Sequence, residues 1–296
     1  MSANNYYSEM LENEIYPARE PRKWAAKLDG GILSGGRYLL QAILRGLPVL
    51  MIFIIFVGGW EIIERVAGIP SYILPKPSDI FEAAAANWDN LLSSIRTTFT
   101  ESLLGFGISI ILGISIATAL ALSRTIERGV YPYAIVLQTI PVVATAPIIV
   151  IWFGAGMNAI VTIAFIISFF PILSNTLIGL NSTDQNMKNL FYLYNATRMQ
   201  TIWKLRIPAA MPYILAGLKI SCSSAVVGAI VGEYIAGIGG GKGGLGYAIT
   251  VAATRLQTPY LFACGLSASL LGILSFLLVN AISKRLLSSW HESEMK

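Results

Sequence analysis

The chain has 296 residues, of which 55% are hydrophobic and only 12% are charged, and it carries a formal net charge of +5. Because soluble domains usually contain about 25% charged residues, this composition excludes an ordinary soluble domain and indicates an integral membrane protein. The basic residues lie in loops beside apolar runs, which is typical of membrane proteins and argues against binding to nucleic acid.

Six apolar runs are long enough, or nearly so, to cross a bilayer as helices, which takes about 20 residues each. In chain order they cover residues 46–63, 95–122, 131–153, 159–180, 212–235 and 260–283. They predict an all-α fold, that of a polytopic membrane protein with six transmembrane helices. We expect three parts: an N-terminal tail (1–45), a transmembrane domain (46–285) and a C-terminal tail (286–296).

The N-terminal tail is basic, and we expect it to lie along the inner membrane surface. No cleavable signal is visible in it, because the first apolar run begins too late. Between the first and second runs, proline-rich residues 74–78 predict an extended stretch. A surface helix is predicted over residues 79–92, with acidic residues in its first turn, where the helix dipole favours them.

The third and fourth runs lie within residues 129–183, a stretch that contains no charged residue and no histidine. A tight connection between them is expected at residues 154–158 (GAGMN), because glycine and asparagine tolerate positive φ. Pro141, Pro147 and Pro171 interrupt these runs, and each proline frees a backbone carbonyl that must find a partner or line a wet cavity. Two interpretations stay open: a translocation path, or ordinary kinked helices packed through serine and threonine. The candidate path residues are Gln138, Pro141, Thr145, Phe170, Asn175 and Glu233.

Three ionisable residues, Glu101, Lys219 and Glu233, lie in or near the predicted spans. Such groups are costly in the bilayer and often mark function. All three are close to span ends, so we expect their polar groups to reach the interface. Glu233 is of most functional interest, because it lies beside a glycine-rich segment, residues 239–246.

The glycine-rich segment does not match a phosphate-binding loop. Ala236 and Gly243 stand where that pattern requires a glycine and a hydroxyl residue. We expect a flexible outer loop or a re-entrant turn instead, and no nucleotide site in this chain.

A polar island, residues 181–206, separates the fourth and fifth runs and is longer than a simple connection between spans requires. Its four basic residues against one acid, Asp184, predict a cytoplasmic location. We predict two short helices, over 184–194 and 196–205, with a break at Asn195 and an end at Ile207-Pro208. Asparagine suits a break because it enters the left-handed region more easily than most residues. The alternative is a solvated loop; we favour a docking element.

The same charge rule orients the whole chain. We place the N-terminus, residues 123–129, the island and the C-terminus in the cytoplasm, and we count Lys219 with that side. The outer side then holds five of the 21 Lys and Arg residues, namely Arg65, Lys76, Arg96, Lys242 and Arg255.

The island resembles the cytoplasmic loop of the membrane subunits of binding-protein-dependent ATP-binding-cassette (ABC) importers, written E-A-A-x3-G-x9-I-x-L-P. Asn195 stands at the glycine position, and Leu205, Ile207 and Pro208 stand at the Ile, Leu and Pro positions. Residues 189–191, Asn-Leu-Phe, stand where Glu-Ala-Ala would be.

The resemblance extends over about residues 72–290 and points to the branch that serves taurine, alkanesulfonate and nitrate. Within this branch the chain is most similar to permeases for pyrimidine-type thiamine precursors and riboflavin. The segments that carry this similarity are residues 74–79 (LPKPSD), 138–141 (QTIP), 152–154 (WFG), 169–172 (FFPI), 232–234 (GEY), 243–247 (GGLGY) and 256–259 (LQTP).

The resemblance implies the type I permease fold of ABC importers and a non-catalytic subunit of the bacterial inner membrane, with both termini cytoplasmic. It implies no cofactor and no metal. The implied partners are a cytoplasmic ABC ATPase dimer, an extracytoplasmic solute-binding protein and a second permease subunit, expected to be identical, in a lipid bilayer. The solute would be a vitamin precursor or a small organic or inorganic anion. The residues expected to couple to the ATPase are Tyr192, Tyr194, Asn195, Ala196, Thr197, Arg198 and Pro208.

A secondary transporter is the main alternative, although internal repeats and carboxylates at mid-membrane are not evident. A membrane hydrolase is less consistent with the sequence, because the single histidine, His291, lies in the C-terminal tail. Two isolated cysteines, Cys222 and Cys264, predict neither a disulfide framework nor a metal site.

Overall fold

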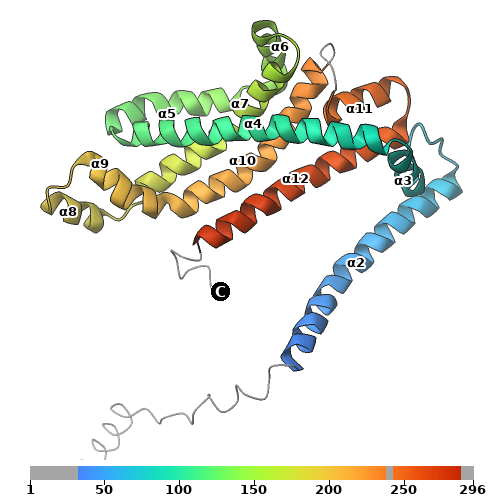
Figure 1. Ribbon diagram of the computed structural model, residues 1–296, viewed down its shortest axis with the longest axis horizontal. Helices are drawn as coiled ribbons and strands as arrows, with labels where there is room; N and C mark the ends of the chain where they lie inside the picture. Colours follow the sequence, from blue (N-terminus) through green and yellow to red (C-terminus); the bar gives the residue numbers. More distant parts are fainter. Residues whose placement is uncertain (1–32, 238–242, 288–296) are drawn as a thin grey trace, which may run out of the picture. The chain divides into compact units, whose positions relative to one another are not determined.

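The computed structural model describes residues 33–237 and 243–287, and this part of the chain consists of helices joined by short loops (Figure 1). The predicted all-α fold is therefore confirmed for the described residues. The predictions for most of the N-terminal tail, for the centre of the glycine-rich segment and for the end of the C-terminal tail lie outside them.

Eleven α-helices and one π-helical turn follow one another in the described residues. They are α2 (Leu33–Ala67), α3 (Pro77–Ala86), α4 (Trp88–Ala121), α5 (Arg124–Thr139), α6 (Val142–Phe153), α7 (Met157–Asn181), α8 (Gln185–Leu193), α9 (Arg198–Thr201), the π-helical turn η2 (Ile202–Arg206), α10 (Ile207–Ala236), α11 (Leu245–Thr254) and α12 (Thr258–Leu287).

The chain divides into two units, one ending at Ile63 and the other beginning at Glu64. The first unit contains most of α2, whose side chains from Leu50 to Phe56 are apolar and exposed. A helix that exposes apolar side chains on all sides suits a lipid environment. The second unit contains all the other helices and is described below by itself.

Four helices in the described residues are long and apolar enough to cross a membrane. They are α4, α7, α12 and the continuous helix Arg198–Ala236, which includes α10. The pair α5–α6 makes a fifth span if its two bent halves are counted together. The protein therefore has at least four apolar spans. The expected first span, residues 46–63, lies inside α2, and the total of six stays a prediction.

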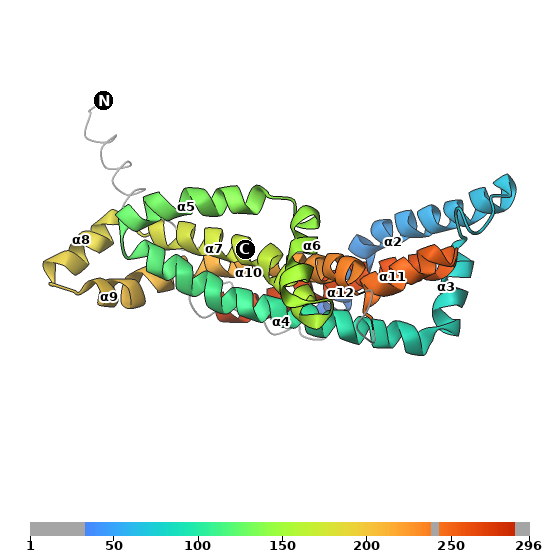
Figure 2. The same cartoon turned by 90° about the horizontal axis from the view of Figure 1, so that it is seen from above.

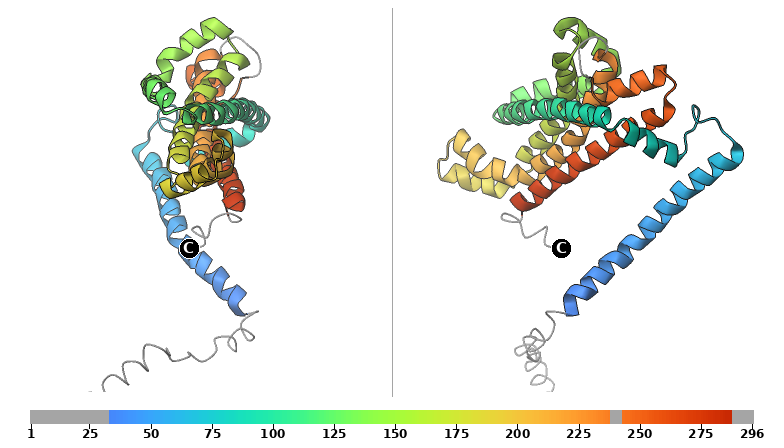
Figure 3. Two further views of the ribbon diagram at one scale, coloured as in Figure 1. Left: turned by 90° about the vertical axis from the view of Figure 1, so that its left-hand side faces the viewer. Right: turned by 45° about the vertical axis from the view of Figure 1, so that its right-hand side comes forward.

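The expected third span, residues 131–153, is not one continuous helix. α5 and α6 meet at an angle of 98°. Ile140 between them has extended dihedrals, φ −68° and ψ 124°, because a residue that precedes proline avoids the helical region. The predicted interruption at Pro141 is confirmed, and α6 visibly leaves the direction of α5 (Figure 3). Pro147 and Pro171 remain inside helices.

Two other local predictions have different outcomes. The surface helix expected over residues 79–92 ends at Ala86, because Asn87 is not helical, and α4 begins directly afterwards at Trp88. The tight connection expected at residues 154–158 is confirmed. Gly154 and Gly156 have φ values of +79° and +121°, which favour glycine.

The second unit is organised around α7, which packs against α4 and α10. α8 and α9 lie at one end of this bundle, and α3 and α11 lie at the opposite end (Figures 1 and 2). Leu120 of α4, Leu173 and Leu177 of α7 and Ile214 of α10 belong to one buried cluster. Lipid provides no hydrophobic drive between helices, so close packing at small residues must hold them together.

The closest approaches are made at glycines. A Cβ atom added at Gly228 of α10 would lie 2.7 Å from the Ala164 Cα of α7, and one added at Gly113 of α4 would lie 2.8 Å from the Ile172 Cγ2. These contacts hold α7 firmly between its two neighbours, and α7 also lines the cavity described below.

Replacing Gly228 by alanine is therefore expected to destabilise the bundle by about 1–3 kcal/mol, because the added methyl group must displace backbone rather than a flexible side chain. The matched control is Gly107→Ala on α4, where an added Cβ meets nothing within 4 Å. Thermal unfolding of the purified protein in detergent measures both. Equal stability of the two variants would contradict the proposed close packing.

Candidate functional site

The first half of the polar island folds as a short helix, α8, followed by a break at Asn195, as predicted. Asp184 caps α8, since its Oδ1 accepts hydrogen bonds from the backbone N–H groups of Asn186 and Met187 at 2.8 and 3.1 Å. Asn195 forms the break with φ +51°, in the left-handed region that asparagine tolerates. Thr197 and Gln200 then form a reciprocal capping box at the start of α9.

The tip of the island exposes large side chains. Tyr192, Leu193 and Tyr194 are 82%, 75% and 80% exposed. Tyrosine is enriched among the residues that dominate protein interfaces, so this surface suits contact with another protein. Leu193 was missed by the sequence reasoning; its signal was an apolar residue between two tyrosines, directly before the predicted break at Asn195.

The second half of the island does not end at Ile207-Pro208, contrary to the prediction. α9, η2 and α10 form one continuous helix, Arg198–Ala236. Pro208 has no N–H to donate, and the backbone just before it uses longer bonds, such as Ile207 N–H to the Ile202 carbonyl. Pro208 thus lies in the first turn of α10, on the far side of η2 from the tip.

Arg206, the last residue of η2, joins the island to the ends of two other helices. Its Nε donates to the Leu180 carbonyl at 2.8 Å, its Nη1 to the Ala121 carbonyl at 2.7 Å and its Nη2 to the Asn181 Oδ1 at 2.8 Å. The last carbonyls of a helix lack partners within the helix and attract positive charge. Arg206 therefore fixes the end of α4 and the end of α7 to the root of the island.

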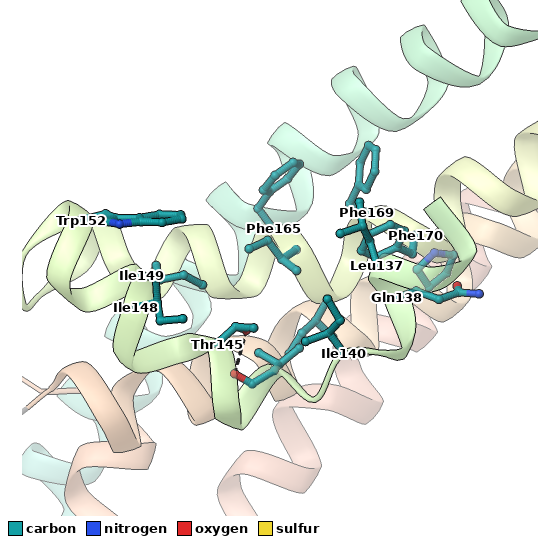
Figure 4. Close-up of a pocket in the computed structure, with 14 residues that line it drawn as sticks. Leu137, Gln138, Ile140, Thr145, Ile148, Ile149, Trp152, Phe165, Phe169 and Phe170 are labelled. Carbon is teal, nitrogen blue, oxygen red and sulfur yellow. Dashed lines mark hydrogen bonds between the residues drawn. The ribbon is translucent and has the colours of Figure 1, made fainter. Parts of the chain in front are cut away.

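A separate cavity of about 580 Å³ lies between α5, α6 and α7 (Figure 4). Apolar and aromatic side chains form most of its wall, and none of its lining residues is charged. Phe165 and Phe169 have ring centroids 5.4 Å apart, and Phe169 and Phe170 5.2 Å apart. The lining residues are Leu137, Gln138, Ile140, Val142, Thr145, Ile148, Ile149, Trp152, Phe165, Ile166, Ile167, Phe169, Phe170 and Pro171.

The cavity brings together three of the predicted path residues, Gln138, Thr145 and Phe170. Pro141 lies at the break between α5 and α6, between two lining residues. Asn175 is not among the lining residues; its Nδ2 donates to the Pro171 carbonyl at 2.8 Å. The sixth, Glu233, lies outside the cavity.

Glu233 belongs to a buried polar cluster at the opposite end of the bundle from the island. Its Oε1 accepts a hydrogen bond from Thr98 Oγ1 and its Oε2 accepts one from the Gly246 N–H, both at 2.6 Å. Thr98 in turn accepts from the Leu245 N–H at 2.8 Å. These bonds fasten the start of α11 to α10 and α4.

The expectation that the acidic groups reach the interface is wrong for Glu101 and Glu233, which are only 5% and 1% exposed. Hydrogen bonds compensate for the loss of water around Glu233. Gly244 has no room for a side chain, because a Cβ atom there would collide with the Glu233 carboxylate. The glycines of this segment thus allow close approach of the backbone to an acid.

Residues 109–288 match the family described as the binding-protein-dependent transport system inner membrane component. The chain belongs to this family. It is 36% identical to the formylaminopyrimidine transport permease protein ThiX of Halalkalibacterium halodurans, over 82% of this chain and 96% of ThiX. It is 33% identical to the riboflavin transport system permease protein RibX of Chloroflexus aurantiacus, over 84% of this chain and 91% of RibX.

More distant relatives include the taurine transport system permease protein TauC of Escherichia coli, 26% identical over 78% of this chain and 85% of TauC. Among solved structures, an inward-facing MetNI methionine ABC transporter aligns with a TM-score of 0.58 and 15% identity, covering 70% of this chain and 99% of that chain. This likeness supports the type I permease fold.

The predicted family and function are therefore confirmed. The protein is a multi-pass permease subunit of a binding-protein-dependent ABC importer for a small solute, and a separate ATPase subunit hydrolyses ATP. Family membership also implies the ATPase, a solute-binding protein and a membrane as its partners. The secondary transporter and the membrane hydrolase are excluded on this ground.

Proposed function

We propose that this permease imports a small solute that contains a planar, uncharged aromatic ring. The observation that carries the proposal is the composition of the cavity between α5, α6 and α7, which combines four aromatic side chains with Gln138 and Thr145. Ligand cavities of about 300–1,000 Å³ with mostly apolar walls and a few polar groups are typical of small organic ligands. Offset stacking on aromatic rings favours a flat solute.

An anionic solute, such as a sulfonate, is less consistent with this cavity. No Lys or Arg lines it, and the stretch 129–183 that forms most of its wall contains no charged residue. An anion that entered this cavity would lose its hydration without gaining a cationic partner, which is unfavourable. The relatives named for formylaminopyrimidine and riboflavin transport agree with a ring-containing solute.

Coupling to ATP is proposed to run through the tip of the island. The exposed surface of Tyr192, Leu193 and Tyr194 would dock on the ATPase, with Asn195, Ala196, Thr197 and Arg198 completing the turn. Movement of the tip would pass along the continuous helix into α10, and through Arg206 into α4 and α7. A shift of α7 changes the wall of the cavity, as expected for a rigid-body switch between inward- and outward-facing states.

The proposed topology has six spans with both termini in the cytoplasm. The domain runs over 46–285 with its coupling loop at 181–208, between tails 1–45 and 286–296. The proposed location is the bacterial inner membrane. A second, identical permease subunit would complete the path at the interface between the two copies.

Topology is tested by single cysteines in a background that lacks Cys222 and Cys264, both buried in the structure. Cysteines at positions 89 and 242 are expected to react with an impermeant maleimide in intact cells, because the charge rule places both outside. A cysteine at position 296 is expected to react only after lysis. Labelling of position 296 in intact cells would reject the proposed orientation.

The coupling role is tested at Ala196, which is half-buried beside the left-handed residue Asn195. Ala196→Glu would place an unpaired charge in the docked contact, and we expect loss of transport at normal expression. Binding-protein stimulation of ATP hydrolysis is expected to fall at least tenfold. Ala196→Ser, small and uncharged, is the matched control and should retain both activities. Normal uptake by Ala196→Glu would remove the coupling role from this turn.

The solute class is tested by uptake into cells that express the complete importer. A labelled pyrimidine or riboflavin is expected to accumulate, while taurine should neither accumulate nor compete. Phe170→Ala should lower the rate about tenfold, since an aromatic contact contributes about 0.5–1.5 kcal/mol beyond its buried area. Phe99→Ala on α4 is the control, because Phe99 is exposed and does not line the cavity. Uptake of taurine in preference to both ring compounds would overturn the assignment.

A further inference from the structure

A second cavity, about 430 Å³ in volume, lies where the island meets the bundle. It is enclosed by the end of α4, the first turns of α5, the end of α7 and the root of the island, at the end of the bundle that carries α8 and α9 (Figures 1 and 2). We call it the basic cavity. Its lining residues are Ala121, Arg124, Glu127, Arg128, Asn181, Lys188, Thr201 and Arg206.

The charges in the basic cavity do not cancel. Four basic residues face one acid, which leaves an excess of three positive charges. Within the described residues, Arg124, Arg128 and Lys188 form no ion pair. Glu127 is already engaged, since its Oε1 accepts a hydrogen bond from the Asn181 Nδ2 at 2.6 Å. The cations therefore lack an anionic partner of matching charge.

The cations are also close enough to affect one another. Burial lowers the pKa of Lys188 from its ordinary value, the nearby charges of Arg206 and Arg124 lower it further, and Asp184 opposes these effects only in part. Basic residues that are well solvated and far apart on a surface would not lower one another's pKa in this way. Like charges held together in a partly enclosed space are unfavourable unless an anion joins them, and Arg and Lys side chains bind phosphate oxygens well.

The position of the basic cavity, beside the first turns of α5, favours a lipid as the source of that anion. The first turns of α5, which supply Arg124 and Arg128, also expose the apolar side chains of Ile126 and Val130. This combination is typical of a helix that begins where hydrocarbon meets headgroups. Basic pockets between membrane helices on the cytoplasmic side suit anionic headgroups.

We infer that the basic cavity binds the phosphate headgroup of an anionic phospholipid of the cytoplasmic leaflet. The inference rests on the proposed orientation of the chain, which places this end of the bundle in the cytoplasm. A bound headgroup would bridge Arg124 and Arg128 of α5 to Lys188 of α8. It would thereby link the island to the first half of the bent pair α5–α6, a link that no hydrogen bond between α5 and α8 provides in the described residues.

The inference is tested on the purified permease–ATPase complex in detergent, by native mass spectrometry during titration with phosphatidylglycerol or phosphatidylcholine of identical acyl chains. Phosphatidylglycerol is expected to bind at least tenfold more tightly than phosphatidylcholine, and less tightly as salt increases. Replacing Arg124, Arg128 and Lys188 together by glutamine should abolish this preference, and Lys188→Gln alone should reduce it.

The matched control is Lys284→Gln, which removes an exposed basic residue near the end of α12, outside the basic cavity. It should leave the preference for phosphatidylglycerol unchanged. An equal loss in this control, or no preference in the unaltered complex, would refute the site.

Two further outcomes would overturn the inference by showing that another partner occupies the basic cavity. Competition by millimolar inorganic phosphate at constant ionic strength would assign the cavity to a soluble phosphate. A preference that appears only after the ATPase is removed would show that acidic side chains of the ATPase occupy the cavity. The measurement requires no transport, so failure of the proposed coupling role would appear in the Ala196→Glu assay alone.

Discussion

The arrangement of the functional parts depends on one arginine. Arg206 satisfies the backbone carbonyls at the ends of α4 and α7 while belonging itself to the root of the island. The last carbonyls of a helix lack partners within the helix, and an unmade hydrogen bond near the membrane surface is costly. The same three bonds therefore complete two spans and fix the direction in which the island leaves them. The chain itself joins the island to α7 and α10, and the bond of Arg206 to the Ala121 carbonyl adds a link to α4.

Close packing around α7 would transmit a movement of the island along this helix. α7 has little freedom between its neighbours, since Gly105, Gly113 and Gly228 bring the backbones almost into contact. A displacement of the end of α7 beside the island would therefore be shared by the residues that line the cavity between α5, α6 and α7, including Phe165 and Phe169. At the opposite end, the bonds of Glu233 and Thr98 fasten the start of α11 to α10 and α4.

Sequence reasoning succeeded at three positions where the dihedral preference of one residue decides the local structure. The break at Asn195, the interruption at Pro141 and the turn at Gly154 each follow from the dihedral preference of one residue. The family followed from the resemblance of the island, and of several segments outside it, to known permeases. Sequence reasoning failed where contacts between residues distant in the chain determine the structure. The burial of Glu233 depends on Thr98 and Gly246, and the role of Arg206 depends on the ends of α4 and α7. No periodicity or spacing reveals such partners.

The bend at Pro141 has a consequence for how the cavity changes its size. α5 and α6 both contribute to the wall, but no helical hydrogen bond continues across Ile140 and Pro141. The junction can act as a hinge, because rotation about two extended residues breaks no helical turn. α5 can then tilt while α6 stays in place. The opening between α5 and α6 would then widen or narrow at little cost in free energy, because no helical hydrogen bond has to break.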